Sequence, residues 1–141
     1  MQNKLIVGQV LWLKIRYQKD KVSNIKHPLL IAKINKKSIE LIAIDKIKGQ
    51  LYNLYYPFNK YISCTNPIEK VISKDSYAQL NNKIIIENFE SLKKYRKTIN
   101  TLSKNKLKEL LNDYFEYQKN TIIKEERKVY IKKEELKELN D

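Results

Sequence analysis

The first half of the chain is a succession of short apolar segments, each too short for a helix and each bounded by polar or turn-forming residues. The first, from Val10 to Tyr17, alternates with a period of two, which is typical of a strand. One face is wholly apolar and is expected to look inward (Leu11, Leu13, Ile15 and Tyr17). The other face ends in two cations and is expected to look outward (Val10, Trp12, Lys14 and Arg16). Such segments favour a sheet.

The next two apolar segments predict a hairpin. Pro28 opens a strand at 29–34, and a strand at 39–44 follows after the turn-forming residues Asn35 to Ser38. The polar residues 18–26 before them predict a long loop. Further short strands are expected at 51–56, 70–72, 76–80 and 83–87, with a loop at 57–68.

One segment alone has a strong helical pattern. Ser103 is a favourable N-cap, and apolar side chains follow at helical spacing as far as Gln118. Beyond Asn120 we expect a strand at 128–131 and a helix at 132–139. Many short strands followed by late helices predict an α+β fold, a small and strongly bent β-barrel with helices packed outside.

Positive charge is concentrated in the part of the chain that is expected to form strands. Residues 1–50 hold 11 Lys and Arg against 3 Asp and Glu, residues 51–100 hold 8 against 4, and residues 101–141 hold 10 against 9. An A/T-rich coding bias explains Lys in place of Arg, but it does not explain the net charge of +13. A polyanion partner is therefore expected, with RNA, DNA and an anionic membrane surface as the candidates.

Composition excludes several other classes of protein. The single cysteine, Cys64, excludes an internal disulfide, and one Cys with one His argues against a zinc site. The N-terminal residues are too weakly apolar for a signal peptide, and no run approaches the ~20 apolar residues of a transmembrane helix. We therefore expect a cytoplasmic protein with no cofactor, no metal and no membrane partner.

His27 and Asp45 are the candidate proton-transfer groups. His27 precedes the strand at 29–34, and imidazole titrates near pH ~6.5 in model peptides. Asp45 closes the strand at 39–44 and is followed by Lys46 and Lys48. If these strands form a hairpin, His27 approaches Asp45. The alternative is an incidental surface histidine and an aspartate that pairs only with its lysines in water, which contributes little.

Such a cluster suits RNA cleavage without a metal. The 2′-hydroxyl of RNA, which DNA lacks, attacks the adjacent phosphate when a base removes its proton and cations stabilise the developing charge. In this hypothesis His27 is the general base or acid, and Asp45 orients it or shares the proton transfer. Lys46 and Lys48 hold the scissile phosphate.

Aromatic rings interleave with lysines in the same half of the chain, and single-stranded bases stack on such rings. Core or barrel-rim positions are the alternative for these rings, and for Tyr114 the core position is preferred. The residues expected to contact RNA are Lys14, Arg16, Lys26, Lys33, Tyr52, Tyr55, Lys60 and Ser76.

The order of these segments resembles the MazF/PemK-like ribonuclease toxins, a family of SH3-like barrels. The resemblance is carried over roughly residues 5–120 by a terminal amphipathic helix and by Gly8–Leu13, His27–Ile31, Asp45–Lys48 and Lys74–Tyr77. His27 stands where the family has a catalytic Arg, and Asp45 where it has Thr or Ser. These differences are closer to the type III branch, the CptN/ToxN/AbiQ-like toxins. The segments 25–28 and 88–96 and the extended tail are most similar to CptN.

The resemblance implies an SH3-like barrel toxin domain at 1–120, with residues 121–141 as an extension packed on the barrel. It further implies a metal-independent endoribonuclease of a type III toxin-antitoxin system, acting in phage defence. Its partners would be an mRNA substrate and a small structured RNA antitoxin, which the toxin processes from a precursor and which then inhibits it, in an assembly of several toxin and RNA copies. Two alternatives remain: a non-catalytic RNA- or DNA-binding barrel, and a protein-targeting toxin on the related CcdB-like fold.

Overall fold

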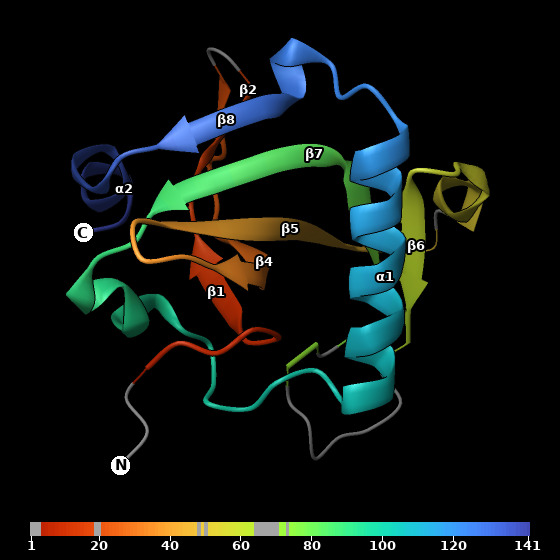
Figure 1. The fold of residues 1–141 in the computed structure, drawn as a ribbon, viewed down its shortest axis with the longest axis horizontal. Coiled ribbons are helices and arrows are strands. Elements are labelled where there is room, and N and C mark those ends of the chain that lie inside the picture. Colours follow the sequence, from red (N-terminus) through yellow and green to blue (C-terminus); the bar gives the residue numbers. More distant parts are fainter. Residues whose placement is uncertain (1–3, 19–20, 48, 50, 64–70, 73) are drawn as a thin grey trace.

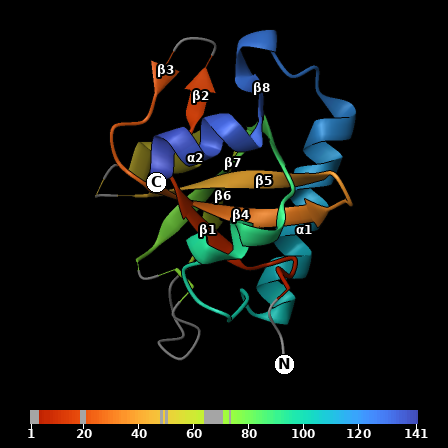
Figure 2. The ribbon, with the colours of Figure 1, turned by 90° about the vertical axis from the view of Figure 1, so that its left-hand side faces the viewer.

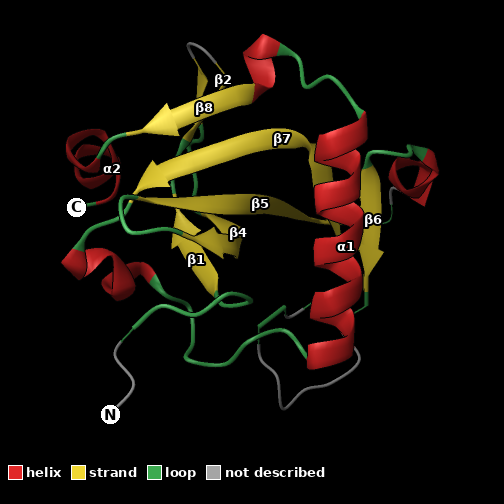
Figure 3. Ribbon diagram, in the orientation of Figure 1, coloured by secondary structure: helices red, strands yellow, loops and turns green. Residues whose placement is uncertain are grey.

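The structure, a computed structural model, describes residues 4–18, 21–47, 49, 51–63, 71–72 and 74–141 (Figures 1 and 3). It is a small α+β protein whose core is mostly sheet. The strands are β1 (Val10–Leu13), β2 (Arg16–Gln18), β3 (Lys21–Val22), β4 (His27–Ile34), β5 (Ser38–Lys46), β6 (Asn59–Ile62), β7 (Ser76–Glu87) and β8 (Lys128–Ile131). The helices are α1 (Lys104–Asn120) and α2 (Lys133–Asn140), and three short 3₁₀ helices are η1 (Leu51–Tyr55), η2 (Glu90–Tyr95) and η3 (Glu125–Arg127).

The main sheet has the order β1-β4-β5-β7-β6, with every neighbouring pair antiparallel. The long strand β7 bends along its length (Figure 1) and has a different second neighbour in each half. Its first half pairs with β6, and its second half pairs in parallel with β8. Among the described residues no strand pairing joins β8 or β6 to β1, so the sheet is bent but not closed into a barrel.

Two apolar clusters lie on opposite faces of this sheet. Strand β5 shows why, because Leu41 contributes to one cluster and Ile42, the next residue, to the other. The first cluster is covered by η2 and α2 and includes Leu11, Leu13, Leu29, Ile31, Ile84, Leu92, Val129 and Leu136. The second is covered by α1 and includes Val10, Leu30, Ile44, Ile62, Ala78, Leu80, Leu110 and Tyr114.

Helix α1 is fixed to the sheet by polar contacts as well as by its apolar face. The hydroxyl of the fully buried Tyr114 donates a hydrogen bond to Glu40 of β5. Burial raises the pKa of Tyr114, and this hydrogen bond raises it further. Lys60 Nζ of β6 lies 2.6 Å from Glu109 Oε1 and 2.9 Å from Asp113 Oδ2, and these bonds raise the pKa of Lys60. The core position preferred for Tyr114 is confirmed.

Residues 121–141 form part of the same body. Strand β8 extends the sheet, and Leu136 of α2 is buried in the first apolar cluster. Figure 2 shows α2 lying across the ends of the strands. Arg16 of β2 joins this region, because its Nε lies 2.9 Å from Glu135 Oε2 and its Nη2 donates to the Tyr130 carbonyl at 2.9 Å. These residues pack on the sheet through Leu136 and also supply one of its strands.

Several expectations about the elements are confirmed. The hairpin of β4 and β5, the extended segment 76–80, the helix that begins after Ser103, and the strand and helix of the tail are all present. Ser103 stands at the N-cap position of α1, but its side chain makes no capping hydrogen bond.

Other expectations are wrong. The strand predicted at 10–17 is interrupted at Lys14 and Ile15. Val10 is buried because it packs in the second apolar cluster, whereas Tyr17 is exposed in β2 of the separate two-stranded sheet. The loop predicted at 18–26 contains β3, which pairs with β2, and the loop predicted at 57–68 contains β6. The segment 51–56 is not a strand but contains η1. Val71 and Ile72 form no strand, and Lys70 lies outside the described residues.

Candidate active site

His27 and Asp45 come together at one end of the β4–β5 pair. Leu29 pairs with Ala43, so His27, two residues earlier, reaches Asp45, two residues later. His27 Nδ1 lies 4.0 Å from Asp45 Oδ1, and both side chains are about one third exposed, at 39% and 34%. The predicted approach of the two residues is therefore confirmed. The pair lies on the sheet face of Leu13, with which His27 pairs across β1.

The second carboxylate oxygen of Asp45 has its own partner. Gln79 of β7 donates a hydrogen bond from Nε2 to Asp45 Oδ2. One carboxylate oxygen is thus engaged by a neutral donor, while the other faces the imidazole. A carboxylate beside Nδ1 favours the tautomer with hydrogen on Nδ1, which leaves Nε2 as a proton acceptor.

Two tyrosines continue this row of side chains across the sheet. Asp45 pairs with Tyr77 of β7, and Tyr77 pairs with Tyr61 of β6, so all three point to the same face. Tyr61 is 47% exposed and Tyr77 is half-buried. The row thus joins a proton-transfer pair to aromatic rings on which a base can stack.

The lysines near this row differ in their distance from His27 along the chain and in the sheet face that they occupy. Lys26 is exposed and directly precedes His27, and Lys14 follows Leu13, the partner of His27. Lys46 is exposed at the end of β5, but strand alternation turns it to the face opposite Asp45, where it pairs with Ser76. Lys48 lies outside the described residues. Of the lysines that the structure describes, Lys26 is therefore the nearest to His27 in the chain.

Other residues expected to contact RNA lie elsewhere. Lys33 is near the far end of β4, about 20 Å from His27 at ~3.3 Å per residue. Lys60 faces α1 and is bonded to it, and Arg16 is bonded to the tail. Ser76 is buried and donates to the Lys74 carbonyl at 2.7 Å.

The two remaining tyrosines belong to η1. Tyr55 is among the most exposed side chains of the protein, at 86%, and the side chain of Tyr52 lies outside what the structure describes. The structure therefore brings together His27 and Asp45 from the expected set, with Lys26 next to His27 in the chain, and not Lys33, Lys60 or Ser76.

A basic and aromatic pocket lies at the β1 edge of the sheet, and its lining includes neither His27 nor Asp45. It has a volume of about 330 Å³ and is lined by Trp12, Lys26, Lys94, Tyr95, Arg96 and Lys97. Trp12 pairs with Pro28, next to His27, and Lys97 Nζ lies 5.5 Å from the centre of the indole ring. Lys26 belongs both to this pocket and to the segment that leads into His27.

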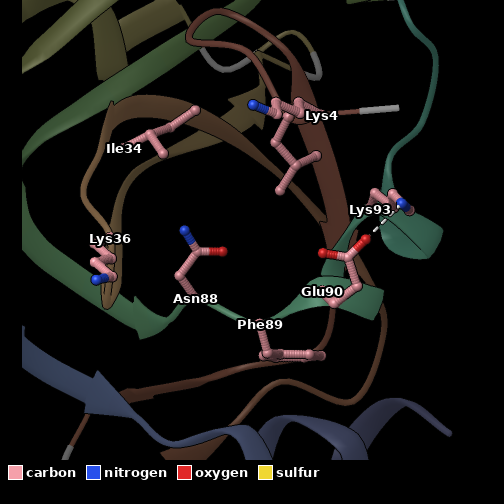
Figure 4. A pocket seen from close by; sticks show the side chains of 8 residues that line it. Lys4, Ile34, Lys36, Asn88, Phe89, Glu90 and Lys93 are labelled. Carbon is pink, nitrogen blue, oxygen red and sulfur yellow. Dashed lines mark hydrogen bonds and ion pairs between the residues drawn. The ribbon is translucent and has the colours of Figure 1, made fainter. Parts of the chain in front are cut away.

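A larger cavity lies at the opposite end of β4. Its volume is about 600 Å³, and Figure 4 shows Ile34, Lys36, Asn88 and Phe89 around it, with Glu90 bonded to Lys93. Its lining includes neither His27 nor Asp45. Cavity size alone therefore does not single out the His27–Asp45 pair.

Sequence reasoning missed Gln79, Arg96 and Lys97 as parts of these sites. Gln79 occupies an ordinary strand position, and only its alternation with Tyr77 placed it on the face of Asp45. The positive charge of Arg96 and Lys97 is their only signal in the sequence. Arg96 pairs with Leu11 of β1, and no sequence pattern predicts this pairing.

The described residues offer neither a cluster of metal ligands nor a membrane-spanning helix. Among them, no three His, Cys, Asp or Glu side chains gather as metal ligands would. No helix in this part of the chain is long and apolar enough to cross a membrane.

No family model, no curated protein sequence and no solved structure matches this chain significantly.

Proposed function

We propose that this chain is a metal-independent endoribonuclease, with His27 as general base and Asp45 as the carboxylate that orients it. The observation that carries the proposal is the exposed imidazole whose Nδ1 lies 4.0 Å from Asp45, in one row with Tyr77 and Tyr61. Beside this pair the row offers aromatic rings for bases, and Lys26, which directly precedes His27, is a cation for phosphate.

The proposed reaction uses the substrate's own hydroxyl. His27 Nε2 accepts the 2′-hydroxyl proton, the 2′-oxygen forms a bond to phosphorus, and the bond from phosphorus to the 5′-oxygen breaks. The 5′-oxygen leaves with a proton from water, so the products carry a 2′,3′-cyclic phosphate and a 5′-hydroxyl. Lys26 stabilises the charge on the phosphoryl oxygens.

At the level of family, we propose a cytoplasmic toxin of the type III toxin-antitoxin branch, built on an SH3-like barrel of the MazF/PemK kind. The bent five-strand order with a helix on one face and the positive charge on the strand-forming part support this proposal. A structured RNA antitoxin would then cover the basic surface around Trp12 and Lys26. Tandem short repeats in the DNA just upstream of the gene would support it.

The test is cleavage of RNA with analysis of the product ends. We expect 2′,3′-cyclic phosphate and 5′-hydroxyl ends without added metal, and no cleavage of an RNA with 2′-deoxy sugars. His27→Ala is expected to lower the single-turnover rate by about 10²–10⁴, while Lys124→Ala, at an exposed tail position, leaves it unchanged. Salt-sensitive RNA binding without any cleavage would instead identify a non-catalytic RNA-binding barrel.

A further inference from the structure

A chain of side-chain hydrogen bonds continues from Asp45 across β7 to the tail. Gln79 Nε2 donates to Asp45 Oδ2, and Asn82 Nδ2 donates to Gln79 Oε1 at 2.6 Å. Arg127 Nη1 of η3 then donates to Asn82 Oδ1 at 2.9 Å. With His27 facing the other oxygen of Asp45, five side chains form one continuous path from a tail arginine to the imidazole.

The direction of every bond in this path is determined by its two ends. Arg127 can only donate, and the ionised Asp45 can only accept. Each amide between them therefore has one orientation that satisfies both neighbours, with its oxygen toward the arginine side and its nitrogen toward the carboxylate side. Turning the amide of Asn82 or Gln79 around would break two bonds of the path at once.

The backbone around these amides is irregular in a way that serves the path. Between β5 and β7 the register jumps, since Leu41 pairs with Ile84 but Ala43 pairs with Gln79. The extra residues on β7 form a bulge that contains Asn82. Gln118 of α1 holds this bulge, because its Nε2 donates to the Leu80 carbonyl at 2.8 Å and to the Asn82 carbonyl at 3.0 Å.

We propose that Gln79, Asn82 and Arg127 are positioning residues, which hold the Asp45 carboxylate so that its Oδ1 faces and orients His27. This inference rests on the proposed function of the His27–Asp45 pair. It makes the tail segment that carries Arg127 a part of the site, although this segment contacts no reacting atom. Arg127 acts only through the two amides.

Isosteric variants separate this role from packing. Asn82→Asp keeps the oxygen that Arg127 binds but removes the donor to Gln79, and Arg127→Met removes the donors at similar length. Both are expected to lower kcat about 10–100-fold with KM unchanged, by analogy with the loss of outer hydrogen-bond partners at metal sites. Arg127→Lys, which keeps a donor, is expected to restore part of the rate. Glu135→Gln is the control, because it removes the negative charge from the tail's ion pair with Arg16 without touching the path.

A second readout does not depend on RNA cleavage. His27 is the only histidine of the chain, so the ¹⁵N chemical shifts of a single imidazole report which nitrogen carries the proton. We expect the Nδ1–H form to dominate in the native protein and in Glu135→Gln, and the Nε2–H form to gain population in Asn82→Asp and Arg127→Met.

The outcomes separate the two hypotheses. If the native protein cuts no RNA but its imidazole signals respond to Asn82→Asp and Arg127→Met, the positioning path stands and the proposed function fails. If RNA is cut but the imidazole signals of both variants match those of the native protein, the path is overturned. The path is also overturned if Glu135→Gln shifts those signals as much as Arg127→Met does.

Discussion

Gly8 adopts a backbone conformation that residues with side chains rarely take, with φ of +97°. Its amide donates to the Ile31 carbonyl at 2.9 Å and its carbonyl accepts from Leu102 at 3.0 Å, so it ties β4 to the segment that leads into α1. A Cβ at this position would lie 2.7 Å from Leu107 Cδ2 and 3.2 Å from Thr101 Cβ. The conformation and the close contact together require glycine here.

We therefore expect Gly8→Ala to lower the free energy of unfolding by about 2 kcal/mol, from backbone strain and the clash with Leu107. Gly49→Ala is the matched control, because Gly49 has φ of +76° but nothing within 4 Å of an added Cβ. It is expected to cost about 1 kcal/mol. Urea unfolding of both variants measures the difference, and equal losses would contradict the role of the Leu107 contact.

At the scale of single residues, sequence reasoning found the groups with distinctive chemistry and missed those with ordinary chemistry. His27 and Asp45 were placed together because a hairpin register follows from two apolar segments and a turn. Asn82 and Arg127 carry no such signal, since their contact crosses the sheet between segments far apart in the chain. Lys60 was misplaced because its role depends on which face of β6 meets α1.

Among the elements, the row across β5, β7 and β6 makes a specific prediction about RNA binding. Tyr61→Ala is expected to weaken binding of a short single-stranded RNA by about 1–3 kcal/mol, because a base loses its stacking partner. Tyr130→Ala is the control, since Tyr130 of β8 is equally exposed, at 48% against 47%, but lies outside the row. Fluorescence anisotropy with a 2′-O-methyl RNA, which resists cleavage, measures both. Equal losses for the two tyrosines would argue against the row.

The elements that sequence reasoning predicted are those whose pattern is local. The β4–β5 hairpin, α1, β8 and α2 follow from alternation, turns and helical spacing. Strand β7 was divided into two pieces because Asn81 and Asn82 are turn-forming residues, yet pairing on both flanks carries the strand through them as a bulge. Residues 51–55 have strand-forming side chains, but β6 takes the place beside β7, so they form η1 outside the sheet.

For the whole molecule, the net charge of +13 predicts strong dependence of RNA affinity on salt. Each phosphate contact on a single strand contributes about 0.7 to the slope of log K against log salt. The double variant Lys26→Ala with Lys97→Ala, which empties the Trp12 pocket of two cations, is expected to reduce the slope by about 1.4.

The control removes the same charge from the tail, as Lys124→Ala with Lys128→Ala. Lys128 is already paired with Glu125 at 2.8 Å, so this variant is expected to leave the slope nearly unchanged. Titrations at several salt concentrations measure both slopes. If the two variants reduce the slope equally, RNA responds to net charge alone and the pocket is not a contact site.

The pairing of β7 with β8 affects the order in which the protein folds during synthesis. The second half of β7 cannot pair with β8 until η2 and α1, which lie between them in the chain, have been synthesised. A parallel partner at such a sequence separation is expected to pair late. During synthesis, the edge at Lys83 to Ile86 is therefore exposed while the β4–β5 hairpin already exists. We expect a nascent chain to hold His27 and Asp45 together before Arg127 has left the ribosome, so that the protein gains its fold in stages and its complete site last.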